Sequence, residues 1–128
     1  MQNLYEYLGE DKIRALVDHF YDAMDTLPEA QTIRSMHPAD LTESRDKFYW
    51  FLVGWSGGPP LYTSKFGHPR LRMRHLPFEV DSAARDAWML CMRKALERIV
   101  EEQEVRETLF TTFYRIADHM RNTEDTDQ

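Results

Sequence analysis

The spacing of apolar residues most constrains what this chain can fold into. In the segment after Glu10, apolar residues recur every three or four positions, at Ile13, Leu16, Val17, Phe20 and Met24. This spacing gives one face of an α-helix an apolar stripe. It recurs around 41–55, 87–99 and 105–120, and no segment alternates as a half-buried strand does. The sequence therefore predicts an all-α fold with four longer helices.

Capping residues mark where these helices begin and end. Asn3 is a favourable N-cap for a short helix that ends at Gly9, before the first long helix. Thr42 is placed to cap the second long helix, and Asp81 or Ser82 to cap the third.

A segment rich in glycine and proline follows the second long helix. Gly-Gly-Pro-Pro at 57–60 ends that helix, and no helical periodicity returns before Pro77. A loop of this length in a compact domain is usually functional or disordered. We expect an ordered loop, because apolar residues recur through it, and Pro69 and Pro77 restrict it to a shaped turn or a single helical turn that ends in His75.

The same segment carries positive charge in an acidic chain. The whole sequence has 22 acidic and 16 basic residues and a net charge of −6, yet Lys65 to Leu76 holds four basic side chains and no carboxylate. The overall charge argues against general affinity for nucleic acid or an anionic membrane. The basic run predicts a local anionic ligand, and the alternative is a solvated basic loop.

Length and cysteine content limit the remaining possibilities. We expect one domain over residues 1–121 and a polar, disordered tail over 122–128. Cys91 is the only cysteine, so no intrachain disulfide forms. The sequence has no secretory signal and no apolar stretch that could span a membrane, which predicts a cytoplasmic protein.

Three residues are candidates for a site. His75 ends the basic loop, where a neutral imidazole can bind a metal, although a lone histidine is also common as a surface or capping residue. The ligand spacing of structural zinc sites is missing. Tyr21 and Trp88 lie on apolar stripes and are either core aromatics or polar groups turned toward a ligand.

Four motifs together resemble a known family, the group II truncated haemoglobins. They are Phe-Tyr at 20–21, Gly-Gly-Pro-Pro-Leu-Tyr at 57–62, Gly-His-Pro-Arg-Leu-Arg-Met-Arg-His at 67–75 and Arg-Asp-Ala-Trp at 85–88. The resemblance extends from about Tyr5 to Met120. It implies a truncated globin-like two-over-two helical sandwich around haem b, with the ordered loop 57–74 leading to the iron ligand.

The resemblance also implies roles for individual residues. His75 matches the proximal iron ligand, and Tyr21 and Trp88 match the distal hydrogen-bond donors. His37 falls at a corner position that is Tyr, Phe or His in the family, and it is a further candidate for the distal hydrogen-bond network.

Further positions match residues around the haem itself. Ser44 and Phe48 match two positions of the distal helix over the haem. Tyr62, Arg72 and Arg74 match contacts of the haem propionates, and guanidinium groups pair well with carboxylates.

The implied function is binding of oxygen, carbon monoxide and nitric oxide at an open iron position. Two distal donors would retain oxygen strongly, which suits redox chemistry, sensing or detoxification of reactive oxygen and nitrogen species better than delivery. An enzyme of this kind would be a haem-dependent nitric oxide dioxygenase or peroxidase-like oxidoreductase with an unidentified reductase. The alternative without haem is a small helical interaction module that binds an acidic partner through Arg70, Arg72 and Arg74.

Overall fold

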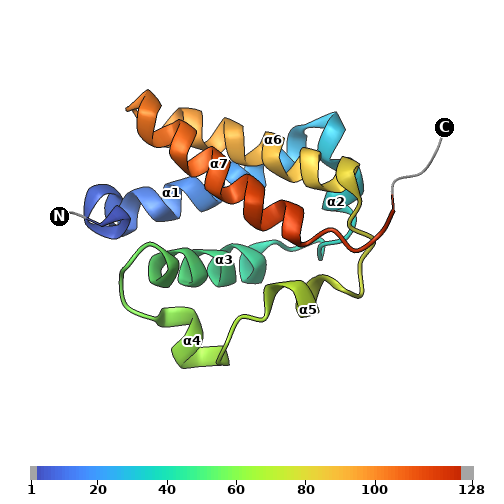
Figure 1. The fold of residues 1–128 in the computed structure, drawn as a ribbon, viewed down its shortest axis with the longest axis horizontal. Helices are drawn as coiled ribbons and strands as arrows, with labels where there is room; N and C mark the ends of the chain where they lie inside the picture. The colour runs from blue at the N-terminus through green and yellow to red at the C-terminus, as the bar shows by residue number, and fades with distance from the viewer. Residues whose placement is uncertain (1–2, 125–128) are drawn as a thin grey trace.

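The computed structural model describes residues 3–124, and every regular element in this range is helical (Figure 1). The four longer helices expected from the sequence are present. In chain order the elements are α1 (Leu4–Thr26), a 3-10 helix (Pro28–Ala30), α2 (Gln31–Arg34), α3 (Thr42–Trp55), α4 (Leu61–Phe66), α5 (Leu71–His75), α6 (Ser82–Ile99) and α7 (Gln103–His119).

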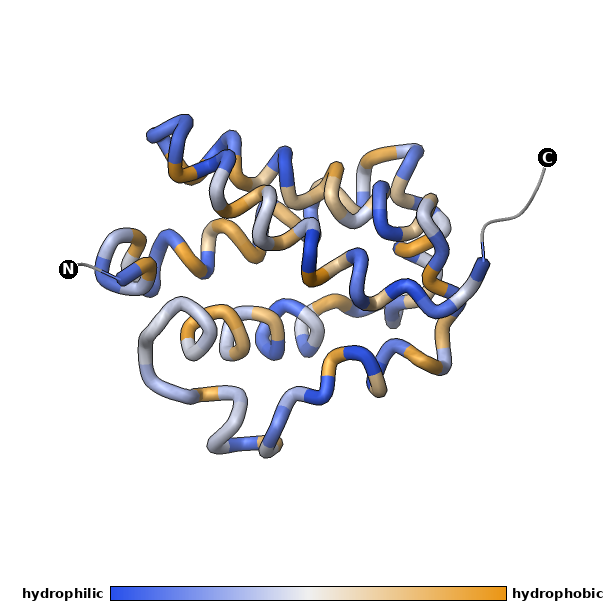
Figure 2. Tube along the Cα trace, viewed as in Figure 1, coloured by the Kyte–Doolittle hydropathy of each residue, from blue (hydrophilic) through white to orange (hydrophobic). Residues whose placement is uncertain are grey.

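The long helices form two pairs that pack on each other. α1 packs against α3 and α6, and α6 packs against α7, so α1 with α3 and α6 with α7 make a two-over-two arrangement. The apolar stripes form the buried core between these helices. Figure 2 shows hydrophobic residues, in orange, recurring along the long helices. Phe20, Met24, Met92 and Leu96 are among the fully buried side chains of this core. The all-α prediction is confirmed.

Two of the three predicted N-caps are present, and the third prediction is wrong. The side chains of Asn3 and Asp81 each accept a hydrogen bond at 2.8 Å from the backbone N–H three residues further on. Thr42 does not cap α3. Its N–H and hydroxyl instead donate to the carboxylate of Asp40, at 2.9 and 2.7 Å, so the turn before the helix supplies the acceptor.

The first turn of α1 folds back against the end of α3. Gly9 has a φ of 81°, a left-handed conformation that breaks the helix as the sequence predicts. The turn before it is held by a 2.9 Å hydrogen bond from the backbone N–H of Tyr5 to the carbonyl of Ser56. A Cβ at Gly58 would lie 2.5 Å from the ring of Tyr5, so only glycine fits under this ring.

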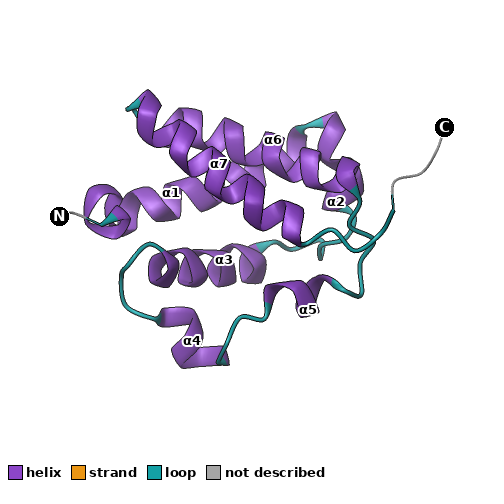
Figure 3. Cartoon of the chain, viewed as in Figure 1, coloured by secondary structure: helices purple, strands orange, loops and turns teal. Residues whose placement is uncertain are grey.

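The segment 57–77 differs from the irregular loop that the sequence predicts, because it contains two short helices joined by turns (Figure 3). α4 presents Tyr62 and Phe66 one turn apart, with ring centroids 4.9 Å from each other, and Tyr62 also packs edge-on against Phe51 of α3 at 6.3 Å. α5 is the expected single helical segment that ends in His75. Arg70, with a φ of 48°, turns the chain into it.

The C-terminal residues return to α5. Asn122, which the sequence assigns to the disordered tail, donates hydrogen bonds to the carbonyls of His75 and Phe78, so the ordered chain extends past residue 121. Residues 125–128 of the expected tail lie outside the described residues. Among the helices of residues 3–124, none has the length and apolar character to cross a membrane.

Candidate functional site

His75 lies at the end of α5 with one ring nitrogen already engaged. Its Nδ1 is 2.6 Å from the backbone carbonyl of Leu71, one helical turn earlier. A carbonyl only accepts, so Nδ1 carries the proton and donates it. The lone pair then belongs to Nε2, which is the arrangement that a metal ligand requires. The sequence did not identify this acceptor, although the i to i−4 spacing of Leu71 and His75 could have indicated it once α5 was expected to be helical.

His37 is a second imidazole held in the same way. Its Nδ1 is 2.9 Å from the carbonyl of Ile33, which again leaves Nε2 with the lone pair when the ring is neutral. Burial lowers the pKa of His37, the hydrogen bond to the Ile33 carbonyl raises it by less, and the charge of Arg34 lowers it further. The ring is therefore neutral near pH 7.

Aromatic contacts bring the predicted distal residues together. Tyr21 is 6 % exposed, and its ring centroid lies 5.9 Å from that of His37 and 6.1 Å from that of Phe48. Phe48 is in turn 6.2 Å from Trp88. Phe20 contacts Tyr21, Phe48 and Trp88 at 4.9 to 5.3 Å and fixes their spacing. Residues from α1, α3, α6 and the corner before α3 thus form one cluster, and half-buried Ser44 lies one turn before Phe48 on α3.

The polar ends of Tyr21 and Trp88 have no partner among the described residues. Burial raises the pKa of Tyr21, although Arg45 lowers it, so the phenol remains a neutral donor. Within residues 3–124, neither the Tyr21 hydroxyl nor the Trp88 indole N–H has a hydrogen-bond partner. No fully buried side-chain polar atom in this range lacks a partner. Both polar atoms therefore keep some solvent exposure.

The basic residues near His75 differ in what they contact. The guanidinium of Arg74 lies 6.0 Å from the ring of Tyr62, and its Nε donates to the carbonyl of Pro69 at 2.7 Å. Arg72 reaches the other way, donating from Nε and Nη2 to two backbone carbonyls at the end of α7, at 3.2 and 3.3 Å. The structure thus groups Tyr62 with Arg74 and directs Arg72 toward α7.

Exposed apolar side chains surround the same segment. Phe66, Met73, Leu76 and Phe78 have exposed fractions of 41 to 54 %, which is unusual for large apolar residues so close in sequence. A cavity of about 550 Å³ lies between α5 and the end of α7. It is lined by both apolar and basic side chains, including Leu71, Met73, Ile116, Met120, Arg72 and Arg115. Such a patch indicates a binding surface for a largely apolar ligand that carries negative charge.

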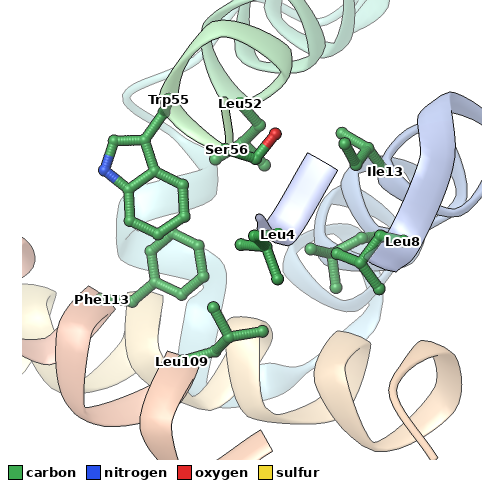
Figure 4. A pocket seen from close by; sticks show the side chains of 9 residues that line it. Leu4, Leu8, Ile13, Leu52, Trp55, Ser56, Leu109 and Phe113 are labelled. Atoms are coloured by element: carbon green, nitrogen blue, oxygen red, sulfur yellow. The ribbon is translucent and has the colours of Figure 1, made fainter. Parts of the chain in front are cut away.

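A small void elsewhere has a different character. It measures about 10 Å³, and its lining is apolar, with Leu4, Leu8, Leu109, Phe113 and Trp55 around it (Figure 4). Trp55 stacks on Phe113 at 5.0 Å. No charged residue lines this void.

The donor set fits haem better than a bare metal ion. In the part of the chain that the structure describes, no three His, Cys, Asp or Glu side chains converge as a metal site. A metal at His75 would therefore need its other ligands from a cofactor, as a porphyrin provides. The exposed apolar side chains suit a porphyrin face, and the guanidinium groups suit its carboxylates.

Comparison with known proteins gives the family. The sequence matches the bacterial-like globin family over residues 3–122. The Group 2 truncated hemoglobin YjbI of Bacillus subtilis is 43 % identical, covering 92 % of this chain and 87 % of that protein. The group II 2-on-2 hemoglobin of Agrobacterium tumefaciens superposes with a TM-score of 0.92 at 45 % identity, covering 98 % and 97 % of the two chains. The truncated oxygen-avid haemoglobin of Bacillus subtilis gives 0.86 at 42 %, covering 94 % and 100 %.

The resemblance read from the motifs is thus confirmed over nearly the whole chain, and so is the two-over-two fold. The chain belongs to the bacterial-like globin family, as a group II truncated haemoglobin, and the cofactor of these globins is haem b.

Proposed function

We propose that haem b lies against α5, within the space bounded by α3, α5 and the end of α7, with Nε2 of His75 as the protein ligand of the iron, and that the protein binds oxygen and other diatomic gases. The hydrogen bond from Nδ1 of His75 to Leu71 carries the proposal, because it leaves Nε2 free and fixes the ring orientation. The haem supplies an iron with one open position for oxygen, carbon monoxide or nitric oxide.

Tyr21 and Trp88 donate hydrogen bonds to the ligand at that position. Both are uncharged donors in an aromatic cluster with low water access, where hydrogen bonds to a charged acceptor are strong. Each such bond contributes about 1.5–3 kcal/mol. His37 can contribute only through Nε2, because its Nδ1 donates to the carbonyl of Ile33. That nitrogen accepts a hydrogen bond or shares a proton with another group. A relative described as oxygen-avid supports strong retention.

The remaining site residues hold the cofactor. Ser44 and Phe48 cover its distal face from α3, and Tyr62 and Arg74 bind a propionate at the exposed edge, which fits their contact with each other. Arg72 reaches the other propionate with the nitrogen that does not contact α7. Strong retention of oxygen suits redox chemistry, sensing or detoxification, with electrons from a separate reductase.

The proposal is tested by haem uptake in matched histidine variants. The wild-type protein is expected to take up one equivalent of haemin and to show a histidine-bound spectrum. His75→Ala should lose haem or hold it weakly. His19→Ala is the control, because His19 lies on α1 and does not line the cavity at α5. A wild-type protein that ignores added haemin, or equal haem loss in both variants, would contradict the proposal.

A further inference from the structure

We infer that Asn122 is a positioning residue for the iron ligand: its amide holds the backbone carbonyl of His75 and so sets where the imidazole lies. The inference rests on the proposed role of His75. Asn122 lies 47 residues away in sequence, beyond the last helix. It joins the C-terminal segment to the turn between α5 and α6.

The side chain of Asn122 uses its whole hydrogen-bonding capacity on this turn. Its Nδ2 donates to the carbonyls of His75 and Phe78, at 3.1 and 3.0 Å. Its Oδ1 accepts from the backbone N–H of Val80 and the hydroxyl of Thr123, each at 2.9 Å. An amide has two donor hydrogens and two acceptor sites of this kind, and all four are occupied. The partners also fix which end is nitrogen, because two carbonyls can face only the donor.

The backbone docks the segment independently of this side chain. The N–H groups of Asn122 and Thr123 donate to the carbonyl of Val80 at 2.9 and 3.3 Å. Arg72 adds hydrogen bonds from α5 to the end of α7. Changing the side chain at 122 therefore removes the contact to His75 while the segment keeps other attachments.

α5 depends on such contacts because it has little packing of its own. It spans only five residues, and none of them is buried. A short element without buried side chains has low local stability, so its position depends on the hydrogen bonds at its ends together with those from Arg72 to the end of α7. One end is the left-handed turn at Arg70, and the other is the His75 carbonyl held by Asn122. The imidazole leaves the backbone at that second end, so a shift there would change the direction in which Nε2 points.

The test compares Asn122→Asp and Asn122→Ala with a control at another asparagine. The aspartate is nearly the same size but places an oxygen against the two carbonyls, whereas alanine removes all four side-chain hydrogen bonds. Asn3→Ala is the control, because it also removes an asparagine side chain with a capping hydrogen bond, far from α5. The readouts are the iron–histidine stretching band of the ferrous protein by resonance Raman spectroscopy and the rate of haem transfer to an apoglobin acceptor.

We expect both Asn122 variants to shift or broaden the iron–histidine band and to lose haem about tenfold faster. Asn3→Ala should lower the melting temperature while leaving the band unchanged. An unchanged band and rate in both Asn122 variants, or the same band shift in Asn3→Ala, would overturn the inference. If alanine prevents folding, the aspartate variant decides alone. A wild-type protein with no iron–histidine band would instead overturn the proposed function, so the two failures are distinguishable.

Discussion

Replacing Trp88 by phenylalanine should accelerate oxygen dissociation. The indole ring packs against Phe20, Phe48 and Phe113, with centroid distances of 4.9, 6.2 and 6.2 Å. A phenyl ring preserves most of these contacts. What it removes is the indole N–H, which has no partner within residues 3–124 and is therefore free to donate to the ligand.

The size of the effect follows from the lost hydrogen bond. A hydrogen bond to a charged acceptor contributes about 1.5–3 kcal/mol, and about 1.4 kcal/mol corresponds to a factor of ten. Oxygen should therefore leave about 10 to 150 times faster from Trp88→Phe. Carbon monoxide accepts much less negative charge from the iron, so its dissociation rate should change much less.

Stopped-flow displacement of oxygen and of carbon monoxide measures both rates. Trp55→Phe is the matched control. Trp55 stacks on Phe113 and lines the small apolar void, not the proposed site. This variant should leave both rates close to those of the wild type. Equal acceleration of both gases in Trp88→Phe would indicate a pocket opened by lost volume. An unchanged oxygen rate would mean that Trp88 is a core residue without a distal role.

Three further predictions concern other parts of the structure. Arg72→Ala and Arg74→Ala should each speed haem transfer by at most about fivefold at low salt, because exposed ion pairs contribute about 0–1 kcal/mol; wild-type rates in both would refute the propionate contacts. Burial raises the pKa of Cys91 to about 11, so the native thiol should resist iodoacetamide at pH 8 and react only after denaturation, as mass spectrometry would show. Hydrogen bonds from Arg85 and Arg121 hold the pKa of Asp118 below its usual 3.8. The unfolded chain therefore binds the proton first as pH falls, and the stabilisation present at neutral pH is lost below about 3.8. The free energy of unfolding, measured in urea titrations, should differ less between wild type and Asp118→Asn as pH falls below about 3.8. A difference that stays constant would contradict this role.

The sequence predicted the features that depend on local pattern. The apolar stripe from Ile13 to Met24 is buried as expected, and Asn3 and Asp81 cap their helices. These features depend on side-chain spacing and on hydrogen bonds to a backbone three residues away, both of which are visible in sequence. α4 was missed because the surrounding glycines and prolines suppress helical periodicity. The pair Tyr62 and Phe66, four residues apart, was the available signal.

The parts that were not predictable depend on contacts between distant segments. The assignment of Asn122 to a disordered tail followed from its polar neighbours, and only the fold brings it against residues 75–80. The direction of Arg72 toward α7 has the same origin, because its acceptors are backbone carbonyls that any sequence would supply. For His75, the family resemblance suggested the ligand, and the helical geometry of α5 supplied the reason that Nε2 is free.

The close approach of Gly58 to Tyr5 constrains how such a chain can diverge over time. A side chain at position 58 would collide with the ring, so it becomes acceptable only after Tyr5 has been replaced by something smaller. Loss of the ring alone would leave a gap under the first turn of α1, which a larger residue at 58 could then fill. The two positions are 53 residues apart (58 − 5) but should change together among relatives. A relative with paired substitutions at positions 5 and 58 would thus be expected to keep the first turn of α1 folded back as it is here.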